Sequence, residues 1–176
     1  LLTGNVGING LLNTRTFQVA LSNTTGSTTI PTPNLSKLSN PSKSHVSDEV
    51  SEMHVAQNGI KREVPIRTID SYEFPQVDMI KVDAEGMELL VLQGAVKTLL
   101  KKRPLLYVED SESDEFHRAS VAGEQPQRTK VMTLLHDLLY VCMDLLSVPQ
   151  MTSILCMPDE SKQIHLDKFF GKLLVI

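Results

Sequence analysis

The sequence predicts an α/β fold, with a mostly parallel sheet and helices on its faces. The first observation is an alternation of apolar strand patterns with helical patterns across residues 80–157. The second is the continuous apolar run 105–108 (LLYV), typical of a parallel strand that is buried on both faces. The third is that an acidic residue follows each of two such strands. Ligands of α/β sheets bind beyond the carboxyl ends of the strands, so these acids mark the candidate site.

The N-terminal third divides into a short ordered part and a long polar one. Residues 1–13 have a loose helical spacing interrupted by glycines, which predicts a short helix or turn, and residues 16–21 follow as a strand. Residues 22–52 are rich in Ser, Thr, Asn and Pro, and they cannot bury enough apolar surface to offset their ordering entropy. We therefore predict a mobile loop at 22–52 within a single partial domain that spans residues 1–176.

The remaining elements follow from hydrophobic periodicity. Apolar residues recur at helical spacing from 87 to 100, and Pro104 ends that helix after three cations. A second helical pattern covers residues 129–139. Short apolar or β-branched runs predict strands at 63–69, 80–82, 105–108, 140–143 and 153–157.

Composition excludes several classes of function. A net charge of -4 provides no broad cationic field, so we expect no nucleic-acid partner. No stretch approaches the roughly 18 apolar residues of a membrane helix, so we expect no membrane segment and favour the cytoplasm. Cys142 and Cys156 are not spaced like metal ligands, so they indicate neither a zinc site nor a disulfide framework. We therefore expect both cysteines to be buried apolar residues.

Two glycosylation sequons begin at Asn23 and Asn34, both within the polar stretch. The pattern is common by chance in a segment of this composition. It also requires a secretory context, which the sequence does not reveal.

The densest group of chemically useful side chains lies where a strand turns into a helix. Lys81, Asp83, Glu85 and Glu88 fall within eight positions, together with Gly86. One interpretation is a strand-end catalytic or binding site. A structural interpretation is that acids in the first helical turn offset the helix dipole and that the glycine permits a tight turn. A third is a divalent-cation site with carboxylate ligands.

Residues 64–109 resemble the signature block of the FkbM family of methyltransferases. The family's "tLDsy" segment is resembled by residues 68–72 and its "iKiDvEGaE" strand end by residues 80–88. Its "G...tL...rP...vE" segment is resembled by residues 94–109. Three linked motifs in register favour a true relationship over a chance match.

The resemblance implies a class I methyltransferase-like, Rossmann-like fold that binds S-adenosylmethionine and methylates a hydroxyl group of a small molecule or glycan. Methyl transfer requires alignment of donor and acceptor and removal of the hydroxyl proton, so a carboxylate near the sulfonium is a reasonable base or orienting group. Asp83 is the first candidate and Glu85 the second, with Lys81 as an ion-pair partner. Glu109 is expected to line the acceptor pocket. Asp70 is expected either to bind substrate or to cap a turn.

The sequence also departs from the family pattern. This fold class normally begins with a strand, a glycine-rich turn and a second strand ending in an acid that holds the ribose. Gly4, Gly7 and Gly10 do not meet that context, so we expect the first strands and the glycine-rich loop to be missing. The alternative function is a non-catalytic α/β interaction module that contacts a partner through residues 22–52.

Overall fold

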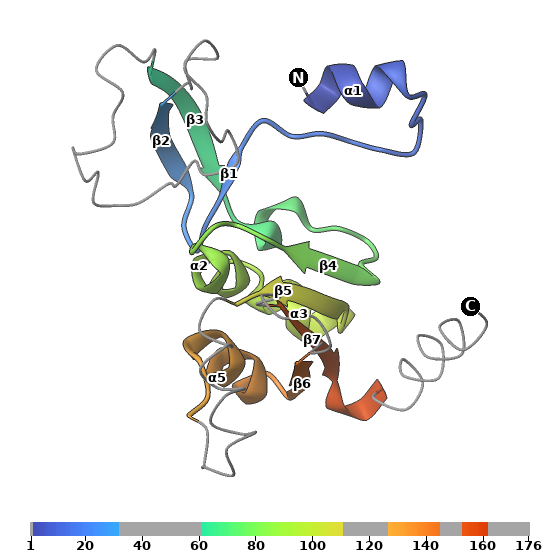
Figure 1. Ribbon diagram of the computed structural model, residues 1–176, viewed down its shortest axis with the longest axis vertical. Helices are drawn as coiled ribbons and strands as arrows, with labels where there is room; N and C mark the ends of the chain where they lie inside the picture. The colour runs from blue at the N-terminus through green and yellow to red at the C-terminus, as the bar shows by residue number, and fades with distance from the viewer. Residues whose placement is uncertain (1, 32–60, 111–126, 145–152, 162–176) are drawn as a thin grey trace.

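The computed structural model describes residues 2–31, 61–110, 127–144 and 153–161, which form two sheets and their flanking helices (Figure 1). The first sheet has three strands in the order β1-β3-β2, and the second has four in the order β4-β5-β7-β6. The mixture of strands and helices confirms the predicted α/β class.

The first sheet follows the short helix α1 (Leu2–Ile8) and contains β1 (Ala20–Leu21), β2 (Gly26–Pro31) and β3 (Lys61–Arg67). β1 is parallel to β3, whereas β2 is antiparallel to it and pairs over all six of its residues.

The position of β2 corrects the predicted loop, because this strand lies inside residues 22–52. Thr28, Thr29 and Ile30 are β-branched, and branched side chains suit a pleated strand once a partner strand is present. Composition alone did not reveal the partner strand of β2, because β3 begins 30 residues after β2 ends. Residues 32–52 lie outside the described part of the chain.

The second sheet contains β4 (Met79–Val82), β5 (Leu105–Glu109), β6 (Tyr140–Asp144) and β7 (Ser153–Pro158). Only the pairing of β4 with β5 is parallel, because β7 pairs antiparallel with both β5 and β6. The described sheets are therefore mixed, and the mostly parallel arrangement that we predicted is not confirmed.

The helical pattern at 87–100 forms two helices, α2 (Glu88–Gln93) and α3 (Val96–Lys102), instead of one. The break falls at Gly94 and Ala95. Gly94 lies against the loop after β1, where a Cβ at this position would sit 2.1 Å from the Ser22 carbonyl oxygen. The predicted third helix is α5 (Lys130–Asp137), and the side chain of Thr129 caps it by accepting a hydrogen bond from the Met132 N–H.

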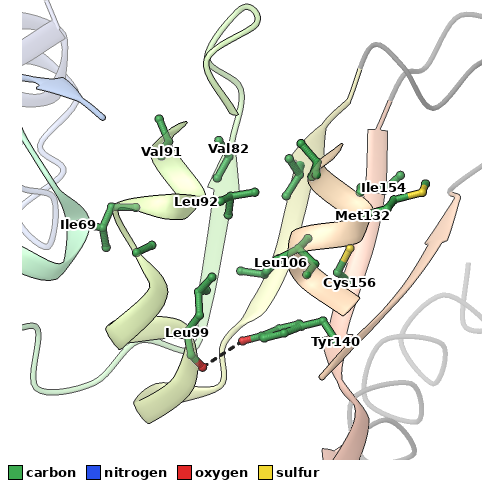
Figure 2. Close-up of a cluster of buried hydrophobic side chains, with 14 residues drawn as sticks. Ile69, Val82, Val91, Leu92, Leu99, Leu106, Met132, Tyr140, Ile154 and Cys156 are labelled. Atoms are coloured by element: carbon green, nitrogen blue, oxygen red, sulfur yellow. Dashed lines mark hydrogen bonds between the residues drawn. The ribbon is translucent and has the colours of Figure 1, made fainter. Parts of the chain in front are cut away.

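Helices α2, α3 and α5 share one face of the second sheet, as Figure 2 shows. Leu92, Leu99 and Leu135 extend from the helices to meet Leu106 of β5 in this core, and all four are fully buried. Burial along β5 alternates, with Leu106 and Val108 buried and the intervening residues half-buried. The prediction that 105–108 is buried on both faces is thus wrong, whereas β7 is buried along its whole length.

The two cysteines are joined, which corrects their interpretation as separate apolar residues. Cys142 of β6 and Cys156 of β7 lie directly opposite each other in the antiparallel pair and form a disulfide. Their sequence spacing gives no hint of this bond because the pairing register of the two strands creates it.

Arg103 fastens the end of α3 to the C-terminal part of the second sheet. Its guanidinium pairs with Glu160 in η3 (Asp159–Ser161) and donates to the carbonyl oxygens of Leu138 at 2.7 Å and Leu139 at 2.8 Å. The same group lies 4.6 Å from the centre of the Tyr140 ring. A cation at the C-terminal end of α5 is favourable for the helix dipole.

Because of the Arg103–Glu160 pair, we expect the folded protein to lose stability in acid. The hydrogen bond from Arg103 lowers the pKa of Glu160 to about 2, below the ordinary glutamate value of 4.5. Because the folded-state pKa is lower than the unfolded one, the stabilisation is complete above pH 4.5 and disappears as the pH falls towards 2. Urea denaturation of wild type and Glu160→Gln between pH 2 and 6 should show a stability difference that shrinks in acid. A difference that is constant with pH would contradict this account, and Glu63→Gln, at an exposed position of β3, is the control.

Among the helices that the structure describes, none combines the length and apolar composition needed to cross a membrane.

Candidate functional site

The candidate site lies at the carboxyl edge of the parallel pair β4 and β5. Lys81 is paired with Tyr107 and Val82 with Val108 in the strand register. Continuing that register by one residue brings Asp83 beside Glu109, and their side chains are hydrogen-bonded to each other. The structure therefore brings together Lys81, Asp83 and Glu109, which the sequence proposed from two separate motifs.

These side chains share one face of the strand pair. Side chains alternate along a strand, so Lys81 and Asp83 point to the face opposite that of Val82, which is part of the helix-covered core. Tyr107 lies on the same face, with its ring centre 6.0 Å from the Lys81 ammonium nitrogen. Sequence reasoning missed Tyr107, although the period of two along 105–109 would have placed it beside Glu109.

The three charged groups shift each other's proton affinity. The Lys81 Nζ lies 2.5 Å from an Asp83 carboxylate oxygen, and about half of each side chain is exposed. This hydrogen bond, followed by the one to Glu109, lowers the pKa of Asp83. The hydrogen bond to Asp83 conversely raises the pKa of Glu109, with further contributions from burial and from the charges of Asp83, Glu85 and Glu88. Asp83 is thus the more acidic carboxyl group and Glu109 the more basic one.

A tight loop connects β4 to α2 and carries Glu85. Both Glu85 and Gly86 have positive φ angles, 50° and 95°. Glycine tolerates this conformation, but for glutamate it is uncommon. The buried carboxylate of Glu88 holds the loop by accepting hydrogen bonds from the N–H groups of Ala84 at 2.8 Å and Gly86 at 3.1 Å. Gly86 therefore permits the turn and Glu88 closes it, while the charge of Glu85 acts on Glu109.

Replacing Glu88 with glutamine is expected to destabilise the fold by about 2 kcal/mol, because charge-assisted hydrogen bonds to two backbone donors are weakened at a buried site. Chemical denaturation of both proteins at pH 7 measures the loss. Glu63→Gln, which removes an exposed carboxylate from β3, should change stability little. Equal stability of Glu88→Gln and wild type would show that Glu88 does not hold the loop.

The orientation of Glu88 bears on the hypothesis of a divalent-cation site at Asp83, Glu85 and Glu88. The Glu88 carboxylate is directed at backbone N–H groups, which repel a cation. Within the described ranges, no group of three His, Cys, Asp or Glu side chains is arranged to hold a metal ion.

Asp70 contacts a different part of the fold. It lies in η2 (Ile69–Tyr72), and its carboxylate accepts hydrogen bonds from the N–H of Lys97 at 3.0 Å and from the N–H and hydroxyl of Thr98 at 2.8 Å. Asp70 thereby caps the first turn of α3 from a segment 27 positions earlier. A role in substrate binding stays a prediction for this residue.

The N-terminal glycines lie in and after an exposed helix. Gly4 and Gly7 fall inside α1, in which no residue is buried, and Gly10 follows with a φ of 64°. A Cβ at any of the three would meet nothing within 4 Å. The glycine spacing is thus not explained by close packing against the rest of the described chain.

Comparison with known proteins gives one result that is consistent with this geometry. No curated protein and no solved structure matches the chain significantly. The family model described as Methyltransferase FkbM domain matches residues 3–142 and so covers most of the chain, including β4, β5 and the loop between Asp83 and Glu88. The chain belongs to the FkbM methyltransferase family.

Proposed function

We propose that this protein transfers a methyl group from S-adenosylmethionine to a hydroxyl oxygen of a small molecule or glycan at the β4–β5 edge. The family supports methyl transfer as the type of chemistry. The observation that carries the proposal for the site is the Asp83–Glu109 carboxyl pair, with Lys81 bonded to Asp83, at the carboxyl ends of two parallel strands.

The residues at this edge suit a cationic methyl donor. Asp83 and Glu109 are in contact, and Glu85 is close enough for its charge to raise the pKa of Glu109. This local excess of negative charge favours a positively charged group. When bound, S-adenosylmethionine would supply an electrophilic methyl group on its sulfonium. Lys81 offsets one carboxylate charge, so the edge remains net acidic.

The two carboxyl groups are suited to different tasks in the same step. Removal of the acceptor proton requires a base whose pKa is closer to the working pH, and the raised pKa of Glu109 favours it as the proton acceptor. Asp83, kept ionised by Lys81, orients the hydroxyl by accepting its hydrogen bond. As the hydroxyl oxygen attacks the methyl group, its proton moves to Asp83 and on to Glu109, which is ionised when the step begins and forms the protonated, hydrogen-bonded pair with Asp83 when it ends. The Tyr107 ring lies on the same face and contacts the Lys81 ammonium group through a cation–π interaction.

The connection between the two strands supports a class I methyltransferase-like sheet. Strand β4, helices α2 and α3, and strand β5 follow one another in the chain, and the two strands pair in parallel. A parallel pair connected through helices is the βαβ unit from which Rossmann-like sheets are built.

Incubation of the full-length protein with isotopically labelled S-adenosylmethionine and an extract of hydroxyl-bearing metabolites and glycans tests this function. We expect the label in methyl ethers, which survive mild alkali. One molecule of S-adenosylhomocysteine should form for each labelled methyl group transferred. Label found only in alkali-labile methyl esters or on nitrogen would contradict the hydroxyl acceptor. Absence of S-adenosylhomocysteine formation with every fraction of the extract would contradict methyl transfer from this donor.

A further inference from the structure

The loop between β1 and β2 exposes a glycosylation sequon. Residues 22–25 cross the end of β3, where Ser22 N–H donates to the carbonyl oxygen of Arg67 at 3.0 Å. Asn23, Thr24 and Thr25 are all exposed in this short connection. They form the Asn-x-Thr pattern to which oligosaccharides are attached. The sequon therefore lies on the surface of the folded chain.

The contacts of Asn23 leave room for a modified amide. Its Nδ2 donates to the Gln93 side-chain oxygen at 3.0 Å, at the end of α2. A primary amide has two N–H groups, and attachment of a sugar replaces one of them. The remaining N–H can keep the hydrogen bond to Gln93, so the folded structure tolerates the modification.

The disulfide supplies the context that a sequon requires. The chain has two cysteines, and both are used in the Cys142–Cys156 bond between β6 and β7. Disulfides form and persist in oxidising compartments and are rare in the cytosol. Oligosaccharides are likewise transferred to Asn-x-Thr sequons in secreted proteins. Two features from separate sheets of the molecule thus point to the same environment, and they favour it over the cytoplasm that composition suggested.

We propose that this protein folds in an oxidising secretory compartment and carries an N-linked glycan on Asn23. In the transfer, the Asn23 amide nitrogen forms a bond to the anomeric carbon of a lipid diphosphate oligosaccharide. The bond between that carbon and the diphosphate oxygen breaks, the lipid diphosphate leaves with its electron pair, and the amide nitrogen loses one proton. No oxidant or reductant is needed. The proposal does not depend on the methyl-transfer reaction.

Peptide mapping of the full-length protein, purified from the cells that naturally produce it, tests the proposal. Trypsin releases residues 16–37 as one peptide, which contains both Asn23 and Asn34. Deglycosylation by an amidase in water enriched in heavy oxygen converts a glycosylated asparagine to a labelled aspartate, and fragmentation of the peptide locates it. We expect the label at position 23. An unlabelled Asn23 would overturn the assignment, including the case in which Asn34 alone is labelled.

Neighbouring threonines provide a matched pair of variants. Thr25→Ala removes the hydroxyl position of the sequon, whereas Thr24→Ala changes its tolerant middle position. Expressed in the same cells, Thr25→Ala should lose the glycan mass and Thr24→Ala should retain it. Alkylation of the protein in denaturant, without reduction, should also leave Cys142 and Cys156 unmodified. Free, alkylated cysteines in the freshly isolated protein would overturn the oxidising compartment.

Discussion

Replacement of Asp83 with asparagine is expected to lower the turnover number for methyl transfer about 100-fold or more, in the range of lost acid–base catalysis. Asparagine keeps the size of the side chain but cannot hold a negative charge beside Lys81, and it cannot pass a proton to Glu109. About half of the Asp83 side chain is exposed, so the fold should tolerate the change. Steady-state formation of S-adenosylhomocysteine by both proteins measures the effect.

Asp78→Asn is the matched control for this prediction. Asp78 precedes the same strand β4 at its opposite end, and its side chain accepts a hydrogen bond from Gln76. Its replacement changes the net charge by the same amount but should leave turnover nearly unchanged. Wild-type turnover in Asp83→Asn would remove Asp83 from the mechanism. An equal loss in both variants would indicate that net charge, and not the position of Asp83, matters.

Gly94→Ala is expected to destabilise the fold by about 3 kcal/mol or more, at the upper end of the cost of overpacking. The added Cβ would lie 2.1 Å from the carbonyl oxygen and 3.0 Å from the carbonyl carbon of Ser22, both of which are backbone atoms. The Gly94 carbonyl also accepts a hydrogen bond from the Asp70 N–H at 2.9 Å, so a shift on either side disturbs another contact. Urea denaturation at pH 7 measures the difference.

Gly26→Ala separates this steric effect from the general effect of replacing a glycine. A Cβ at Gly26, the first residue of β2, would meet nothing within 4 Å. The variant should be as stable as wild type or slightly more so, because alanine has fewer unfolded conformations. If Gly94→Ala behaved in the same way as Gly26→Ala, the loop after β1 would not pack closely against Gly94.

The sequence was most informative where structure depends on neighbouring residues. The apolar runs that became β4 and β5, and the acids that follow them, are visible in the chain itself. Parallel pairing of these strands brings Asp83 to Glu109, so their meeting follows from the predicted topology. The family predicted from the three motifs of residues 64–109 is confirmed by the match over residues 3–142.

The sequence was least informative where distant residues meet. The division of the predicted helix at 87–100 depends on the Ser22 carbonyl at Gly94 and on the Asp70 carboxylate at the first turn of α3. The Cys142–Cys156 bond depends on the register of β6 and β7. None of these contacts has a local signature, because each is created by packing between segments that periodicity treats separately.

Calorimetric titration of the full-length protein with S-adenosylhomocysteine tests the central claim most directly, because it requires no knowledge of the methyl acceptor. The account predicts saturable binding at one site in each chain. Absence of binding, in a protein whose cooperative unfolding shows that it is folded, would contradict its assignment as an S-adenosylmethionine-dependent methyltransferase.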